Sequence, residues 1–142
     1  EAGAAAHAGW TIAAQLNGDF TQAKAYEETL AYLQSSPAPD VVYCENDNMC
    51  FGVMQALDEL GIAYGDGGVT LISFDAGRTA LSYCKDGKID LCAECNPLHG
   101  PRVRALIEQL ARGETPEKLS YMPEALFTAD TLTAELLESR VY

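Results

Sequence analysis

Basic residues are scarce in this chain of 142 residues, which has nine Lys and Arg against 21 Asp and Glu and a net charge of −12. Phosphate backbones and anionic membrane surfaces are bound through clustered Lys and Arg. The composition therefore disfavours nucleic acid and anionic membrane surfaces as partners. The sequence also lacks any apolar run near the roughly 20 residues that a membrane-spanning helix needs.

Motifs for catalysis or metal binding are missing as well. The chain has two His, and its five Cys fit no strong zinc pattern. The glycine-rich residues 65–68 precede a predicted strand, whereas a phosphate-binding loop follows a strand and opens a helix. We therefore expect no metal, no cofactor and no enzymatic activity. Cys44 and Cys92 are expected in the core, and the sequence leaves open whether any of the five Cys form a disulfide.

Short hydrophobic runs alternate with stretches of helical periodicity along the chain. The runs cover residues 10–15, 41–44, 69–74 and 89–95, and the helical stretches cover residues 23–33, 47–60, 80–84 and 103–110. Two strand-like fragments, 119–122 and 125–127, and a helix over 128–139 follow. This alternation predicts an α/β fold, a three-layer sandwich with a mainly parallel sheet.

Polar and aromatic residues gather where the predicted strands end. They are Phe20, Asn46, Asp47, Asp75 and Asn96. In parallel sheets ligands bind beyond the carboxyl ends of the strands. Asp and Asn can hydrogen-bond adjacent sugar hydroxyls while an aromatic ring covers the apolar face of the sugar. Each residue also has a plainer interpretation: Asp47 as a helix cap, Phe20 as a core residue, and Asn46 and Asp75 as turn residues.

Three segments carry a resemblance to a known family. Residues 42–57, 72–77 and 93–101 resemble periplasmic sugar-binding proteins of the ribose/galactose type, in particular the galactofuranose-binding branch. The resemblance implies a periplasmic binding protein type I lobe, and it places this chain in the C-terminal half of such a protein. Proteins of this family hold a sugar between two similar lobes and deliver it to the permease of an ABC transporter.

The resemblance also implies roles for individual residues. Phe20 matches the ring that covers one face of the sugar, Asn46 an amide that bonds its hydroxyls, and Asp75 a carboxylate that accepts from two hydroxyls. Asp47 is expected to cap the following helix. Cys95 stands where ribose-binding proteins have a hinge Gln, so Cys95 and Asn96 are candidate ligand-binding or hinge residues.

The same resemblance divides the chain into three parts. Residues 1–95 are expected in the C-terminal lobe, residues 96–121 cross the hinge and supply a helix to the N-terminal lobe, and residues 122–142 return. Without most of the N-terminal lobe, the helix within 98–113 would expose an apolar stripe, through which this fragment is expected to self-associate. Residues 1–9 read as the end of a helix, so the chain is expected to begin inside a domain.

The expected function is the substrate-binding component of a sugar ABC transporter. Its ligand would be a monosaccharide, a pentose or hexose with the furanose form among the candidates, and its location periplasmic or extracellular at the cell envelope. One alternative is the effector-binding core of a bacterial transcription repressor, which shares this fold. A second is a small α/β hydrolase or phosphatase with Asp75 as nucleophile, which needs a base or metal that the sequence does not offer.

Overall fold

A four-stranded sheet forms the centre of the protein, whose computed structural model describes residue 3 and residues 6–142. The strands are β1 (Val41–Tyr43), β2 (Thr70–Asp75), β3 (Leu91–Glu94) and β4 (Leu126–Phe127). The helices are α2 (Gln22–Leu33), α3 (Asp47–Leu60), α4 (Arg78–Lys85), α5 (Gly100–Ala111) and α6 (Ala134–Ser139). Strands β1, β2 and β3 are parallel neighbours, and β4 runs antiparallel to β3. The predicted α/β class with a mainly parallel sheet is confirmed.

The core lies between one face of this sheet and helices α3 and α4. Leu71, Cys92 and Phe127 point from β2, β3 and β4 into a cluster that includes Leu57 of α3 and Leu81 of α4. Leu136 and Leu137 of α6 pack against the same cluster, so α3, α4 and α6 form one helical layer of the predicted sandwich. Burial of these apolar side chains is the main stabilising contribution to the lobe.

Helix α3 has the boundaries that its sequence predicts. Asn46 has an extended backbone and caps the first turn, and Gly61 ends the helix at φ +65°, a conformation that glycine adopts without steric cost. Helix α2 packs on α3 at Gly52, where a Cβ atom would come within 2.3 Å of the Gln22 carbonyl oxygen. The two helices therefore approach each other as closely as their backbones allow.

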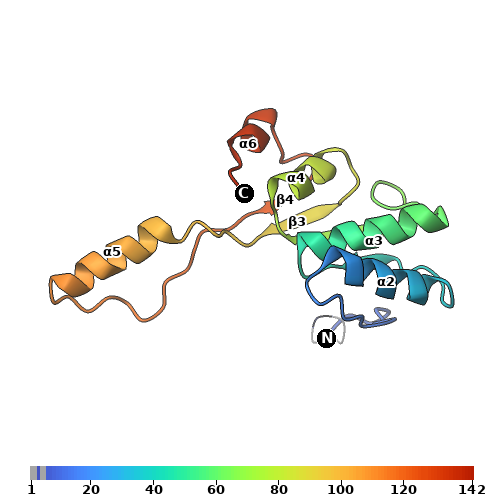
Figure 1. The fold of residues 1–142 in the computed structure, drawn as a ribbon, viewed down its shortest axis with the longest axis horizontal. Coiled ribbons are helices and arrows are strands. Elements are labelled where there is room, and N and C mark those ends of the chain that lie inside the picture. Colours follow the sequence, from blue (N-terminus) through green and yellow to red (C-terminus); the bar gives the residue numbers. More distant parts are fainter. Residues whose placement is uncertain (1–2, 4–5) are drawn as a thin grey trace.

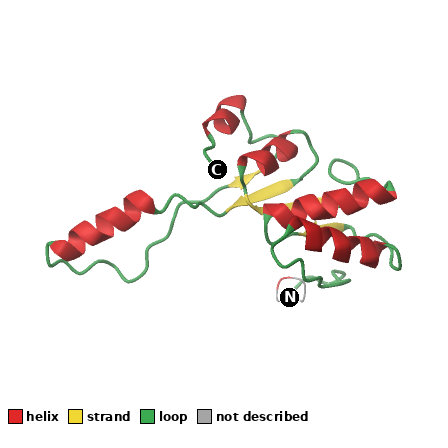
Figure 2. Ribbon diagram, in the orientation of Figure 1, coloured by secondary structure: helices red, strands yellow, loops and turns green. Residues whose placement is uncertain are grey.

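Helix α5 projects away from the rest of the protein on two connecting segments (Figure 1). These segments run side by side where they leave the sheet, because the Glu94 amide donates to the Ala125 carbonyl at 2.9 Å and the Asn96 amide donates to the Glu124 carboxylate at 3.2 Å. No residue of α5 is buried. In Figure 2 only loop connects α5 to the sheet. The helix is therefore held by its two connections rather than by packing.

Three sequence predictions differ from the structure. Residues 10–15 are not a strand but irregular chain, and Trp10 and Ile12 are exposed. A strand is stabilised by its neighbours, and no described strand pairs with this segment. Residues 119–122 are likewise irregular, with Tyr121 83% exposed. The last helix begins at Ala134 rather than near residue 128, because Thr128 and Thr131 bond each other in a turn and Thr133 caps the helix.

Other expectations concern the cysteines and the first residues. All five cysteines are free; Cys44 and Cys92 are buried as predicted, together with Cys50 and Cys84, and Cys95 is exposed. The predicted helical end at residues 1–9 falls in part on positions 1, 2, 4 and 5, which lie outside the described residues, and residues 6–9 form turns and a bend. Among the described helices, none combines the length and the apolar character needed to cross a membrane.

Candidate functional site

The carboxyl edge of the parallel strands brings three of the predicted site residues together. Asn46 follows β1, Asp75 ends β2, and Phe20 precedes α2. The Asn46 side-chain amide donates to the Phe20 carbonyl at 3.3 Å, which joins the start of α2 to the start of α3. The neighbouring Asp47 contacts the loop that follows Asp75, so all three residues border one edge of the sheet.

Phe20 presents its ring to solvent at this edge. Phe20 is 66% exposed and takes no part in the core, so the interpretation of Phe20 as a core residue is wrong. Asp19 and Phe20 have φ values of +49° and +54°, a left-handed conformation that is uncommon for a bulky side chain. An exposed aromatic ring held by an unusual backbone can cover the apolar face of a ligand.

Asn46 combines a structural contact with spare hydrogen-bonding capacity. Its Oδ1 accepts the Met49 amide at 2.8 Å and caps α3, while its Nδ2 donates to Phe20. An amide side chain has two donor hydrogens and two acceptor lone pairs. One donor and one acceptor position of Asn46 therefore remain for further partners beyond these two bonds.

Asp47 has a different role from the one predicted. The expectation that Asp47 caps α3 is wrong, because Asn46 makes the cap and Asp47 is the first helical residue. The Asp47 carboxylate points inward, where Oδ1 accepts from the Ser73 hydroxyl at 2.5 Å and Oδ2 accepts from the Gly77 amide at 2.8 Å. Burial raises the pKa of Asp47, and the nearby Asp75 carboxylate raises it further, against the lowering effect of these hydrogen bonds.

Asp75 lies in a turn of unusual backbone geometry. Asp75 and Ala76 have φ values of +100° and +57°. Burial raises the pKa of the half-buried Asp75 carboxylate, and a backbone hydrogen bond from Asp47 lowers it in part. The residue borders a hollow of about 320 Å³ between α3 and α4 whose lining includes Phe51 and Arg78. Of the candidate ligand residues Phe20, Asn46 and Asp75, Asp75 alone lines this hollow.

Cys95 and Asn96 lie where the chain leaves the sheet towards α5. The exposed Cys95 donates its amide to the Asp75 carbonyl at 3.3 Å, and the Asn96 Oδ1 accepts the Leu98 amide at 2.9 Å. Cys95 is thus a neighbour of Asp75, whereas Asn96 orders the start of the crossing segment. A hinge or ligand-binding role for Cys95 and Asn96 stays a prediction.

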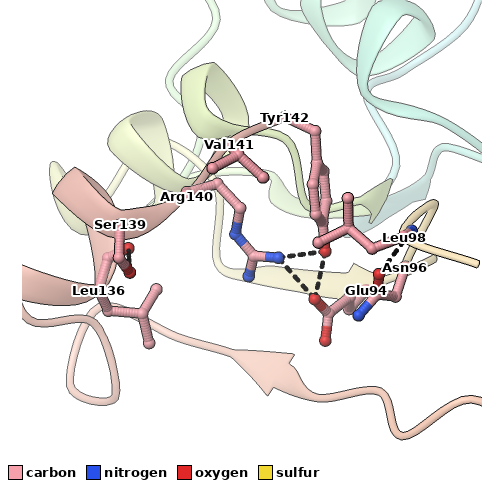
Figure 3. Close-up of a pocket in the computed structure, with 8 residues that line it drawn as sticks. All are labelled: Glu94, Asn96, Leu98, Leu136, Ser139, Arg140, Val141 and Tyr142. Atoms are coloured by element: carbon pink, nitrogen blue, oxygen red, sulfur yellow. Dashed lines mark hydrogen bonds and ion pairs between the residues drawn. The ribbon is translucent and has the colours of Figure 1, made fainter. Parts of the chain in front are cut away.

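A second cluster at the carboxyl edge was not predicted from the sequence. Arg140 Nη1 lies 2.5 Å from Glu94 Oε1, the two side chains are each 9% exposed, and the Tyr142 hydroxyl bonds both (Figure 3). Burial raises the pKa of Tyr142 to about 12, with a further contribution from Glu94. The cluster borders a hollow of about 220 Å³. Because 46 residues separate Glu94 from Arg140, no local pattern in the sequence indicates their pairing.

The C-terminal residues also reach the Asp75 turn. The Arg78 amide donates to the Tyr142 carbonyl at 2.7 Å, and the Arg78 side chain donates to the Arg140 carbonyl. The chain end therefore fixes the start of α4, directly after the turn. Within the described part of the chain, no group of three or more His, Cys, Asp or Glu is arranged to hold a metal ion.

Comparison with known proteins assigns the chain to a family. Residues 1–111 match the model of the periplasmic binding protein domain. The chain belongs to the periplasmic binding protein family. Among curated relatives, the galactofuranose-binding protein YtfQ of Escherichia coli (strain K12) is 31% identical over 124 residues, which cover 84% of this chain and 39% of that protein.

Comparison with solved structures agrees with this family assignment. A structure from Mycobacterium smegmatis in complex with β-D-fucofuranose matches with a TM-score of 0.77 and 32% identity, over 84% of this chain and 39% of that one. The binding protein of the arabinose ABC transporter from Shewanella sp. ANA-3, bound to α- and β-L-arabinofuranose, matches with a TM-score of 0.79 and 25% identity, over 92% of this chain and 47% of that one. The chain thus spans less than half the length of these relatives.

Proposed function

We propose that this chain forms one lobe of the sugar receptor of an ABC transporter. The observation that carries the proposal is the meeting of an exposed aromatic ring, a side-chain amide and a carboxylate at one sheet edge, contributed by Phe20, Asn46 and Asp75. These groups suit a neutral sugar, since the ring can cover C–H groups while the polar groups bond hydroxyls. The family match and the sugars named for the similar proteins support the same function.

The ligand is a monosaccharide, and furanose forms come first among the candidates. Galactofuranose, fucofuranose and arabinofuranose are the sugars named for three similar proteins. The receptor acts in the periplasm or outside the cell at the envelope, delivers its sugar to a permease and is not an enzyme. Its net charge of −12 favours this function over a repressor core that must act at DNA.

The division of the chain into lobes is part of the proposal. Residues 1–95 and 122–142 belong to the lobe described above, and residues 96–121 cross a hinge and contribute α5 to a second lobe. Three observations support this division: α5 has no buried residue, its Val103 and Ile107 are 49% and 60% exposed, and the two connecting segments lie side by side. A second lobe would cover this apolar stripe and complete the cleft.

Isothermal titration calorimetry tests the proposal. The full-length product of the gene is titrated with pentoses and hexoses in furanose and pyranose forms, alongside its Phe20→Ala, Asn46→Ala and Asp75→Ala variants. One sugar is expected to bind tightly, and each variant to weaken its binding at least about tenfold, because a buried polar partner or stacked ring is lost. Asp66→Ala, in an exposed loop before β2, is the control and should bind as the parent does. Absence of heat with every sugar would refute the proposal.

A further inference from the structure

The turn that presents Asp75 has a backbone conformation that its own residues do not favour. Asp75 and Ala76 are consecutive non-glycine residues at φ +100° and +57°, where a Cβ atom crowds the backbone. Ala76 is completely buried, so the turn cannot relax into solvent. Such a conformation persists only where the surrounding structure holds it.

One carboxylate holds this turn on both sides of Asp75. Asp47 accepts from the Ser73 hydroxyl at 2.5 Å, two residues before Asp75, and from the Gly77 amide at 2.8 Å, two residues after it. Space for the contact is tight, since a Cβ atom on Gly77 would lie 3.3 Å from the Asp47 carboxylate. Hydrogen bonds to an ionised acceptor are stronger than those between neutral groups.

Asp47 also fixes the turn relative to a second candidate ligand residue. Asp47 is the first residue of α3 and directly follows Asn46, whose side chain caps the same helix. The start of α3 therefore carries Asn46 outward and Asp47 inward, and the inward side chain is tied to the Asp75 turn. Any displacement of this turn changes the spacing between the Asn46 amide and the Asp75 carboxylate.

We infer that Asp47 is a positioning residue for sugar binding, which sets the Asp75 carboxylate against the Asn46 amide without contacting the ligand. This inference rests on the proposed function, because the effect on affinity passes through Asp75. Both carboxylate oxygens of Asp47 already accept hydrogen bonds, and the residue is 8% exposed. Asp47 lines the same hollow as Asp75, but it is buried and its carboxylate is turned towards Ser73 and Gly77, whereas Asp75 is half-buried; Asp75 is therefore the carboxylate that a ligand reaches.

Amide hydrogen exchange and calorimetry on the full-length gene product test the inference together. Asp47→Ala removes both contacts, and exchange at Gly77 is expected to accelerate about tenfold or more as its hydrogen bond is lost. Sugar affinity is expected to fall about 10- to 100-fold, as for other displacements of a binding group by about an ångström. Asp47→Asn can still accept from Gly77 and donate to Ser73, so it should restore most of the affinity. Glu45→Gln, an exposed charge loss two residues away, should change neither quantity.

A double variant separates positioning from general stability. In an Asp75→Ala background, Asp47→Ala should weaken binding by less than about threefold, because the residue through which it acts is gone. If Asp47→Ala does not fold, Ser73→Ala takes its place and should cost about threefold or more in affinity.

Some results would overturn this inference, and another would overturn the proposed function. Unchanged exchange at Gly77, unchanged affinity, or an equal loss in the Asp75→Ala background would each overturn the inference. If the parent protein binds no sugar, the proposed function fails, and the exchange data alone then decide whether Asp47 holds the turn.

Discussion

The buried ion pair between Glu94 and Arg140 offers the sharpest test of how the lobe is held together. The two groups lie 2.5 Å apart with side chains that are each 9% exposed. The guanidinium also lies 5.0 Å from the centre of the Phe127 ring and 4.7 Å from that of the Tyr142 ring. Figure 3 shows Arg140, Glu94 and Tyr142 together. Glu94→Gln keeps the shape of the side chain but leaves the Arg140 charge buried without its carboxylate.

The structure sets the expected size of the effect. Removing one partner of a buried pair costs about 3 kcal/mol or more, because the remaining charge stays desolvated. In a chain of this length about 3 kcal/mol corresponds to a fall in Tm of about 10 °C. The matched control is Glu28→Gln, which breaks a pair with Lys24 on α2 whose side chains are 36% and 43% exposed. An exposed pair of this kind contributes about 0.5 kcal/mol.

The pH dependence of stability provides a second test of the same ion pair. Burial alone would raise the pKa of Glu94, but the Tyr142 hydroxyl and the Arg140 guanidinium outweigh it and hold the pKa below its ordinary value of 4.5. A carboxyl whose pKa is lower in the folded than in the unfolded protein stabilises the fold above pH 4.5. This contribution is lost as the pH falls from 4.5 through the folded-state pKa. The stability difference between the parent and Glu94→Gln should therefore shrink over that range.

Circular dichroism during heating and during urea titration measures both effects. Parent, Glu94→Gln and Glu28→Gln are compared at pH 7 and at several values below pH 5. A loss of less than about 1 kcal/mol for Glu94→Gln at pH 7, or a loss equal to that of Glu28→Gln, would refute the reasoning. Either result would mean that the Glu94–Arg140 pair contributes no more to the stability of the fold than an exposed ion pair does.

Three further predictions use other parts of the structure. Gly52→Ala should lower the free energy of unfolding, measured by urea titration, by about 2–3 kcal/mol, because the added Cβ would clash with the Gln22 carbonyl. The control Gly100→Ala, which has open space around the added Cβ, should be nearly neutral. A thiol reagent such as DTNB should label Cys95 alone in the native chain and all five cysteines after unfolding; rapid labelling of a second thiol would contradict the structure. The 142-residue chain should self-associate in light scattering, and Ile107→Glu, on the exposed stripe of α5, should make it monomeric; a parent chain that is already monomeric would rule this out.

Local patterns were sufficient to predict the parts of the fold that depend on local interactions. Helix α3 is an example, since its apolar spacing, its polar N-terminal residues and Gly61 all act within a few residues of one another. Residues 10–15 have an equally strand-like pattern but no described neighbour to pair with. Pairing depends on residues distant in the sequence, so a pattern alone does not establish a strand.

The candidate site shows the same division between local and distant causes. The position of Asp75 at a strand end follows from a local hydrophobic run. Its backbone conformation does not, because φ values of +100° and +57° at Asp75 and Ala76 are stabilised by contacts from Asp47 and not by turn residues of the usual kind. The Glu94–Arg140 pair is likewise created only when the last residues of the chain return to β3.

The adjacent Asn46 and Asp47 explain why the cap was predicted at the wrong residue. Both side chains are good helix caps, so their sequence does not decide between them. The neighbouring groups decide which residue caps the helix. The side chain of Asn46 faces the Phe20 carbonyl oxygen and the Met49 amide, so a group at this position must donate one hydrogen bond and accept another. An amide can do both, whereas a carboxylate only accepts. The inward position offers two donors, the Ser73 hydroxyl and the Gly77 amide, which suit a carboxylate. Exchanging the two residues would leave the Phe20 carbonyl without its donor, because a carboxylate at position 46 cannot donate, so the order of the two residues is fixed by what the neighbouring segments offer.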